Sequence, residues 1–241
     1  MDIRIFETSE ELDLYAAEIF RKLINEKPNA VLGLATGSTP VGIYAKMVED
    51  YTNKKVSFSG VTTYNLDEYV GLTPDNDQSY AYYMNKNLFS HVDIPAIQTH
   101  LPDGMAEDPQ EECVRYEAMI NACPADIQLL GLGHNGHIAF NEPDEQLSAG
   151  THVVKLKEET LEANARFFAS IDDVPKEAYT MGIGSILKAN TILLVVRGSD
   201  KAHIVKEALT GPITTQVPAS LLQTHPRVTV LLDREAGRML G

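Results

Sequence analysis

Four polar segments of the sequence carry residue types that bind anions or transfer protons. Thr-Gly-Ser-Thr stands at 36–39, Asn-Leu-Asp-Glu-Tyr at 65–69, a stretch with two histidines at 131–142, and Arg-Gly-Ser-Asp-Lys at 197–201. Each segment follows an apolar run of strand length. Ligands of α/β proteins bind at the carboxyl ends of parallel strands, so we expect the four segments to lie around one site.

The first segment favours anion binding. Thr36, Gly37, Ser38 and Thr39 form a small, hydroxyl-rich turn, and we expect Thr39 to cap a helix that begins at Pro40. Free backbone N–H groups at such a helix start attract anions. The alternative is an ordinary strand–helix turn. A Walker phosphate loop is excluded, because its Gly-Lys-Ser/Thr ending is missing.

Two basic residues stand in settings that also favour an anion. We expect Ser199 to cap a helix that runs through Leu209, which puts Lys201 in the first turn, where a cation opposes the helix dipole. A bound anion would explain a lysine at that position. Arg166, beside two phenylalanines, is the second candidate. The alternatives are a solvated surface lysine and an arginine that is ion-paired at a helix end.

The second segment supplies candidate bases. Asp67 and Glu68 are adjacent at a strand exit, and a role in the core is disfavoured because unpaired acids are costly to bury. Neighbouring residues of an extended chain point to opposite sides, so only one of the two needs to face the site. Either could act as a general base. A solvated acidic loop is the alternative.

The third segment supplies a candidate acid–base histidine. His137 and Glu142 can pair, so that the carboxylate orients the imidazole, and Asn135 can fix the ring or contact a substrate. The segment begins with a Gly-x-Gly-x-x-Gly dinucleotide pattern, but Pro143 follows too soon for the long helix that this pattern should open. Nicotinamide and flavin cofactors are therefore disfavoured. His134, His137 and Glu142 could also hold a metal, yet they lack the spacing of a helical zinc motif.

The charge and composition of the chain exclude some classes of binding partner. The 34 acidic and 20 basic residues give a net charge of −14, which argues against binding to nucleic acids or anionic membranes. No apolar run approaches the ~18 residues of a membrane span, and the first residues lack a secretory signal. On one helix Cys113 and Cys123 would be about 15 Å apart, too far for a disulfide, so we expect a reduced, cytoplasmic protein.

Apolar runs of strand length alternate with amphipathic segments, a pattern typical of a layered α/β sandwich. The runs are continuous, which indicates strands covered on both faces and hence a parallel sheet. The predicted strands are 30–35, 61–66, 126–132, 178–183, 191–196 and 228–232; the predicted helices are 9–27, one from 39, 108–121 with Asp108 as its cap, and 199–209. No linker divides the chain, so we expect one domain over 1–241, with a mobile lid at about 144–170.

A carboxylate and a histidine without a cofactor motif suit proton transfer next to a carbonyl, as in sugar-phosphate isomerisation. At these same segments the sequence resembles the glucosamine-6-phosphate deaminases, over about residues 3–233. The matching segments are 32–40, 65–72, 136–143, 163–168 and 198–202, and the strings Asp-Glu-Tyr-Val-Gly-Leu and Gly-His-Ile-Ala-Phe-Asn-Glu-Pro are highly specific together.

The resemblance implies a modified Rossmann-like α/β fold, a three-layer sandwich with a mostly parallel sheet. It also implies conversion of glucosamine 6-phosphate and water to fructose 6-phosphate and ammonia, in amino-sugar catabolism, with no metal or organic cofactor. Asp67 resembles the base that moves a proton between C2 and C1, and His137 the residue that opens the sugar ring, with Glu142 and Asn135 completing its relay. The implied phosphate cradle is Thr36, Gly37, Ser38, Thr39, Arg166 and Lys201.

Two departures from the family pattern affect the expectations. Many members have Asp where this chain has Asn135, so we expect activity without a full acid relay. The chain also ends before the C-terminal extension of the longer, allosteric members, and their basic activator-binding positions align with His152 and Val154. The resemblance therefore implies a monomer that needs no activator.

Two rival functions remain open at this point. A 6-phosphogluconolactonase of the same fold would share the phosphate cradle and the histidine loop, and the segment 65–68 discriminates, because isomerisation needs a base over C2. A non-catalytic sugar-phosphate sensor would carry a DNA-binding module and often lack the base. This chain keeps Asp67 and His137 and shows no basic helix-turn-helix flank, which disfavours the sensor.

Overall fold

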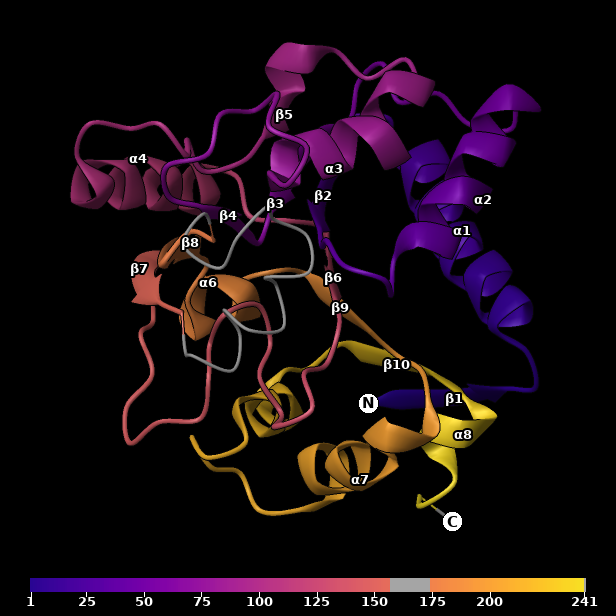
Figure 1. Ribbon diagram of the computed structural model, residues 1–241. Helices are drawn as coiled ribbons and strands as arrows, with labels where there is room; N and C mark the ends of the chain where they lie inside the picture. The colour runs from indigo at the N-terminus through magenta and orange to yellow at the C-terminus, as the bar shows by residue number, and fades with distance from the viewer. Residues whose placement is uncertain (157–173, 241) are drawn as a thin grey trace.

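A parallel seven-stranded sheet forms the centre of the computed structural model, which describes residues 1–156 and 174–240 (Figure 1). The strand order is β1-β10-β9-β6-β2-β3-β5, and every neighbouring pair is parallel. The strands are β1 (Asp2–Phe6), β2 (Val31–Leu34), β3 (Thr62–Asn65), β5 (Thr99–His100), β6 (Ile127–Leu130), β9 (Thr191–Val196) and β10 (Val228–Asp233).

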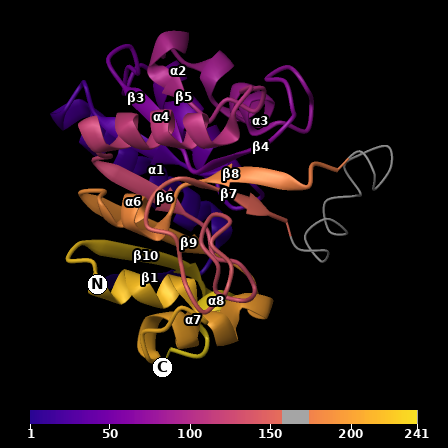
Figure 2. The same ribbon diagram turned by 90° about the vertical axis from the view of Figure 1, so that its left-hand side faces the viewer.

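Helices cover both faces of this sheet, which confirms the predicted α/β class. On one side α1 (Ser9–Glu26) packs against α2 (Val41–Thr52), and on the other α4 (Pro109–Ala122) lies beside α6 (Ile183–Leu187) (Figures 1 and 2). The remaining helices are α3 (Tyr80–Asn87), α7 (Ala202–Thr210) and α8 (Arg234–Gly237), with 3-10 turns η1 (Phe89–His91), η2 (Ala96–Gln98), η4 (Ser199–Lys201) and η5 (Pro218–Thr224).

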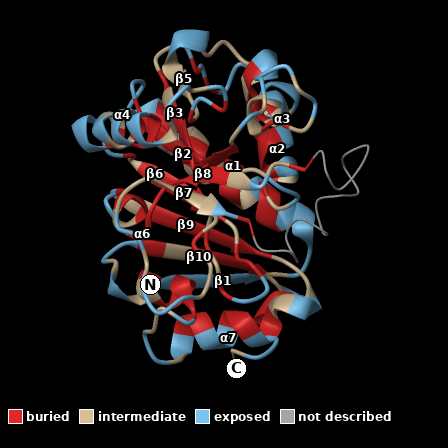
Figure 3. Cartoon of the chain, turned by 60° about the vertical axis from the view of Figure 1, so that its left-hand side comes forward, coloured by how far each residue is buried: buried red, intermediate tan, exposed pale blue. Residues whose placement is uncertain are grey.

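The core lies between the helices and the sheet. Figure 3 shows the buried residues running along β9 and β10, as the continuous apolar runs predict. Helix α1 begins with a capping box in which Thr8 and Glu11 exchange hydrogen bonds, and it buries a face at helical spacing, including Leu12 and Phe20, against this core. No helix in the described residues is long and apolar enough to cross a bilayer.

A small antiparallel sheet stands beside the carboxyl ends of the central strands. Its order is β4-β8-β7, formed by β4 (Asp67–Tyr69), β8 (Glu177–Thr180) and β7 (His152–Lys155). The strand predicted at 178–183 is shorter than expected, and it belongs to this antiparallel sheet and not to the central parallel sheet. A continuous apolar run indicates that a strand is buried, but it does not indicate whether the strand is parallel or antiparallel. Strands β1, β4, β5 and β7 were missed, since they are short or alternating in polarity.

Helix starts differ from the prediction at two of the candidate anion sites. Helix α2 begins at Val41 with Pro40 as its N-cap and no side-chain cap, so the cap predicted at Thr39 is wrong. Ser199 is not a cap either: Ser199–Lys201 forms the 3-10 turn η4, and α7 starts only at Ala202. The cap predicted at Asp108 is confirmed, with its carboxylate accepting from the first free N–H groups of α4.

The second half of the predicted lid at 144–170, from residue 157 on, lies outside the described residues, and so does Arg166. Within the described part, the backbone carbonyl of Asp144 accepts hydrogen bonds from Thr215 Oγ1 at 2.6 Å and Gln216 Nε2 at 2.7 Å. The start of the predicted lid is thus fastened to the loop before η5. Both cysteines are free thiols, Cys113 buried and Cys123 exposed.

A carboxylate on α4 holds the small sheet in place. Glu117 Oε2 accepts from the backbone N–H of Thr151 at 2.8 Å, from its hydroxyl at 2.9 Å and from Ser185 Oγ at 2.6 Å, while Lys188 Nζ lies 3.0 Å from Oε1. Burial alone would raise the pKa of this carboxyl, but the donors hold the pKa of Glu117 at about 2. One side chain therefore joins α4, α6 and the entry to β7.

We expect Glu117→Gln to destabilise the protein by about 1–3 kcal/mol at pH 7, because the amide NH₂ group would face N–H and O–H groups that now donate to the carboxylate. A carboxyl with a depressed pKa in the folded state stabilises above its unfolded pKa and loses that contribution as pH falls. The difference in unfolding free energy between the variant and the wild type should therefore disappear as the pH falls from about 4.5 to 2. Urea unfolding at several pH values measures it. Glu107→Gln, at an exposed acid, is the control, and an equal effect there would contradict the assignment.

Candidate active site

The four polar segments meet in one cleft of about 620 Å³ at the carboxyl ends of β9, β6, β2 and β3, which are consecutive neighbours in the sheet. Of the predicted site residues, the cleft is lined by Thr36, Gly37, Ser38, Thr39, Asp67, His137 and Lys201. Asn135 and Glu142 stand behind His137. The expected convergence of the strand ends is thus present, and Arg166 is the one predicted residue that the described structure does not place.

Tyrosines from two neighbouring helices hold the first half of the loop at 36–39. The Tyr44 hydroxyl donates to the carbonyl of Ala35 at 2.6 Å and accepts from its N–H at 3.2 Å. The Tyr83 hydroxyl of α3 donates to the carbonyl of Gly37 at 2.6 Å. These contacts fix the backbone that leads into the start of α2, where unpaired N–H groups are available to an anion.

Asp67 faces the cleft and Glu68 faces the interior. Asp67 is 7% exposed, and no described residue makes a hydrogen bond or an ion pair with its carboxylate. Burial, and then the neighbouring charge of Glu68, raises the pKa of the Asp67 carboxyl to about 8. A carboxylate with a raised pKa and no partner is suited to accept a proton from carbon.

Glu68 has a structural role. Its carboxylate accepts from the backbone N–H groups of Tyr69 and Tyr80 at 2.9 Å and of Ala81 at 2.8 Å. It thereby binds the free N–H groups at the start of α3, where a negative charge also complements the helix dipole. Of the two candidate bases, the structure leaves Asp67 to the cleft.

His137 is oriented from behind by an acid and an amide. Its Nδ1 lies 3.0 Å from Glu142 Oε1, with a bent approach that makes the contact more electrostatic than a straight hydrogen bond. Asn135 Nδ2 donates to Glu142 Oε2 at 2.5 Å, and Asn135 Oδ1 accepts from the backbone N–H of His137 at 3.2 Å. With Nδ1 turned to Glu142, Nε2 is the ring nitrogen available to a substrate.

A buried amide fastens the histidine loop to the small sheet. Asn141, 3% exposed, donates from Nδ2 to the carbonyls of Ile138 at 3.0 Å and Met181 at 2.9 Å. The N–H of Phe140 donates to Thr180 Oγ1 at 3.1 Å. Because Thr180 pairs with Asp67 across β4 and β8, the same strand positions both the histidine loop and the candidate base.

Lys201 closes the cleft on the side of β9. Burial lowers the pKa of its half-buried ammonium, while the charge of Asp200 raises it. Asp200 is itself held by His134, whose Nε2 lies 2.6 Å from Asp200 Oδ2. Because His134 pairs with Asp200 instead of joining His137 and Glu142, the metal alternative has no cluster: no group of three His, Cys, Asp or Glu side chains among the described residues could hold an ion.

Sequence reasoning missed an aromatic wall and a cation of the cleft. Tyr80 and Phe140 line the cleft and lie parallel, with ring centroids 6.3 Å apart, and Tyr69 lies 4.9 Å from Tyr80. Arg197, at the end of β9, also lines the cleft. No sequence signal marks Tyr80, which stands among other aromatic residues of α3; Arg197 does stand in a segment that the strand-end rule selects.

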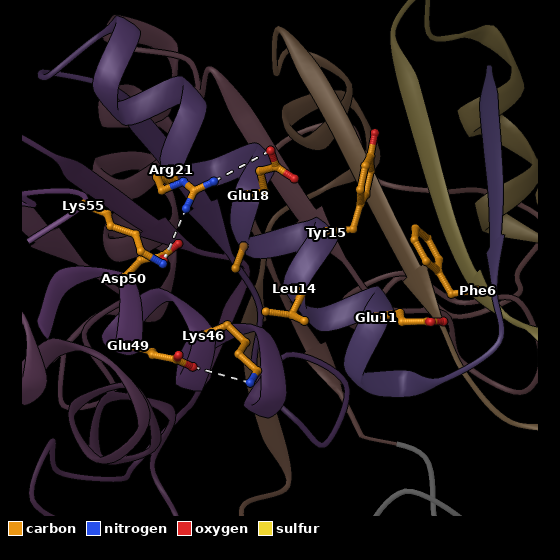
Figure 4. A pocket seen from close by; sticks show the side chains of 11 residues that line it. Phe6, Glu11, Leu14, Tyr15, Glu18, Arg21, Lys46, Glu49, Asp50 and Lys55 are labelled. Carbon is orange, nitrogen blue, oxygen red and sulfur yellow. Dashed lines mark hydrogen bonds and ion pairs between the residues drawn. The ribbon is translucent and has the colours of Figure 1, made fainter. Parts of the chain in front are cut away.

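A second hollow lies between α1 and α2 and looks polar enough to bind a ligand (Figure 4). Its cations are already neutralised, however. Lys46 pairs with Glu49 and Glu10, and Arg21 and Lys55 both approach Asp50. The hollow is therefore an ordinary solvated ion-pair surface, where such pairs contribute little.

The comparisons with known proteins agree with this geometry. The sequence family described as glucosamine-6-phosphate isomerases and 6-phosphogluconolactonases matches residues 6–231, and the chain belongs to this family. A 6-phosphogluconolactonase structure from Trypanosoma brucei has a TM-score of 0.79 at 19% identity, covering 100% of this chain and 98% of that one, and shares the fold alone.

Its more similar relatives are glucosamine-6-phosphate deaminases. The protein of Thermoanaerobacter pseudethanolicus is 51% identical over 100% of this chain and 95% of its own length. That of Clostridium perfringens is 50% identical over the full length of both. A solved structure of a monomeric glucosamine-6-phosphate deaminase has a TM-score of 0.95 at 48% identity, covering 99% of this chain and 100% of that one.

Gly133 supports the ring of His137, which yields a test of the histidine's placement. A Cβ at position 133 would lie 2.3 Å from Cε1 and Nε2 of that ring. We expect Gly133→Ala to displace the imidazole and lower turnover about 10²-fold, the cost of a small misplacement, while the melting temperature changes little. Gly150→Ala, where the nearest atom would be a tolerable 3.4 Å away, is the matched control. Equal turnover in both variants would mean that the ring position is unimportant.

Proposed function

We propose that this protein is a glucosamine-6-phosphate deaminase, which converts glucosamine 6-phosphate and water to fructose 6-phosphate and ammonia. The observation that carries the proposal is the buried carboxylate of Asp67, which has no partner among the described residues and lies in the same cleft as His137 and the loop at 36–39. The deaminase relatives at about half identity over the full chain support the same reaction.

In the proposed reaction His137 opens the sugar ring first. Nε2 takes the proton of the anomeric hydroxyl and the ring oxygen receives a proton as the C1–O5 bond breaks, which leaves an open-chain aldehyde. Glu142 stabilises the imidazolium that forms in between, and Asn135 keeps Glu142 in position. The relay ends at Glu142, because an amide cannot carry the charge.

Asp67 then moves a proton between carbons. Its carboxylate takes the C2 proton, which gives an enolamine, and the proton is returned at C1 to give an imine at C2. Water adds to the imine carbon and the C2–N bond breaks, releasing ammonia and leaving the ketone. The pKa of about 8 makes the carboxylate a stronger base than an exposed aspartate once it is ionised, so kcat/KM should rise with pH toward that value.

The phosphate is assigned to Thr36, Gly37, Ser38, Thr39 and Lys201, with Arg166 as a further candidate outside the described residues. The fastened loop and Lys201 line the same cleft, which supports this assignment. A hydrolase acting on a lactone is the rival. The base Asp67 favours the deaminase, since lactone hydrolysis requires no proton transfer from carbon.

We further propose that the enzyme is cytoplasmic, acts as a monomer, as the similar solved deaminase does, and needs no activator. The positions that would hold an activator's phosphate carry His152 and Val154, and Val154 can give no charge. We also propose that the chain forms one catalytic domain, in which a lid over 144–170 closes on the phosphate. The proposed reaction uses no metal and no organic cofactor.

Replacing the proposed base tests the reaction directly. We expect Asp67→Asn to lower turnover by about 10²–10⁴-fold, the usual contribution of a positioned base, with KM nearly unchanged. A coupled assay of fructose 6-phosphate measures it and also separates deaminase from lactonase. Near-normal turnover of the variant would refute the assignment, and a wild type without fructose 6-phosphate production would refute the function.

The same variant carries its own folding control. A carboxyl whose pKa is higher folded than unfolded loses stability as pH rises from about 4 toward 8, because the folded state must give up a proton that it holds more tightly. Asp67→Asn should therefore melt at least about 2–4 °C above wild type at pH 8 and match it below pH 4. A lower melting point would mean that lost turnover reflects misfolding.

Lys201 tests the phosphate assignment. We expect Lys201→Ala to raise KM for glucosamine 6-phosphate at least about tenfold with a smaller change in kcat, since a charge-assisted contact to a ground-state group is lost. Lys206→Ala, at an exposed lysine of α7, is the control. An unchanged KM for Lys201→Ala would remove this residue from the phosphate site.

A further inference from the structure

A partly buried ion pair lies beside the proposed phosphate end of the cleft. Asp13, on α1, is 7% exposed, and Arg197 lines the cleft at the end of β9. Both terminal nitrogens of the guanidinium meet the carboxylate: NH2 contacts Oδ1, and NH1 lies 3.3 Å from Oδ2. The Nε of Arg197 is buried and has no hydrogen-bond partner in the described part of the chain. The pair therefore joins α1 to the strand that leads into Lys201.

The carboxylate of Asp13 also lies against the start of α2. A Cβ at Gly42, the second residue of α2, would be 2.0 Å from Asp13 Oδ2, so only glycine leaves room for the acid. The helix start that Asp13 touches is the one that follows the loop at 36–39. A negative charge is favourable for the helix at this position, but it opposes the binding of an anion to the same N–H groups.

We propose that Arg197 and Asp13 are a charge-compensating pair that sets the affinity of the cleft for phosphate. Arg197 neutralises a carboxylate that would otherwise repel the substrate's phosphate from the start of α2. The positive field of the helix start and of Lys201 is thereby left to the ligand. The inference rests on the proposed phosphate site. It adds two residues that affect phosphate affinity through their charges and take no part in the proton transfers.

The proposal predicts opposite signs for the two single substitutions. Arg197→Met leaves an uncompensated carboxylate and should weaken binding about tenfold, whereas Asp13→Asn leaves an uncompensated cation and should strengthen it about threefold. The double variant should return to within about twofold of wild type, because both charges are gone. The readouts are the KM for glucosamine 6-phosphate and the binding of inorganic phosphate by calorimetry. Values of kcat should stay within about twofold in all three, since Asp67 and His137 are untouched.

A second ion pair supplies the matched control. Lys27 Nζ lies 2.8 Å from the carboxylate of Asp126, which is partly buried before β6, at the amino end of the sheet and away from the cleft. Lys27→Met removes the cation of an ion pair, as Arg197→Met does, while Asp126 keeps the backbone N–H of Val31 as a donor at 2.8 Å. We expect Lys27→Met to lower stability without changing phosphate affinity. If Arg197→Met fails to fold, Asp13→Asn and the double variant still carry the test, because neither of them leaves a carboxylate at position 13 without its cation.

Each outcome decides the question. Opposite signs with recovery in the double variant support charge compensation. Weakening by both single substitutions, or no change in either, would overturn it and leave a purely structural pair. Calorimetry measures the effect of the ion pair on the affinity for inorganic phosphate even if the wild type converts no glucosamine 6-phosphate. Failure of the proposed function is therefore distinguishable from failure of this inference.

Discussion

The burial of one carboxylate, Asp67, is the constraint on which the rest of the site depends. A base that removes a proton from carbon must be kept from water and from cations that would lower its pKa, yet such burial opposes folding at neutral pH. The fold meets both demands by placing Asp67 on β4, which leaves the central sheet after Leu66 and pairs with β8 instead. Strand pairing fixes the backbone of Asp67 while its side chain is left without a partner among the described residues.

Other acids of the site differ from Asp67 because each has donors. Glu68 accepts three backbone N–H groups, Glu117 accepts from four side chains and one backbone N–H, and Asp13 faces a guanidinium. These carboxylates hold α3, the small sheet and the start of α2 in place. This distribution has an energetic reason: a hydrogen bond donated to a buried carboxylate stabilises the fold, and Asp67, the proposed base, receives none from the described residues. Glu68, Glu117 and Asp13 therefore contribute to stability, whereas Asp67 is left to the proposed reaction.

The sequence predicted the class of fold and where the site lies, because continuous apolar runs and strand ends are local signals. It could not predict that 178–183 turns into an antiparallel sheet, since the apolar pattern of a buried strand is the same in either direction. The caps expected at Thr39 and Ser199 are wrong, because α2 begins one residue later, after Pro40, and a 3-10 turn precedes α7; a capping residue type does not fix the exact helix start. Asp13 and Arg197 lie 184 positions apart, and no spacing rule links them. Periodicity thus predicts elements and strand-end chemistry, whereas partners across the fold depend on the packed structure.

Asn135 shows how a departure from a family pattern follows from its contacts. Its amide nitrogen lies 2.5 Å from Glu142 Oε2 and its oxygen accepts the backbone N–H of His137. A carboxylate at the same place would put two like charges within hydrogen-bond distance, and one of them would have to bind a proton. The amide donates instead, so Glu142 stays an acceptor for the imidazole at any pH where it is ionised. In the proposed reaction Glu142 supplies the negative charge that stabilises the imidazolium of His137, and Asn135 contributes position without charge.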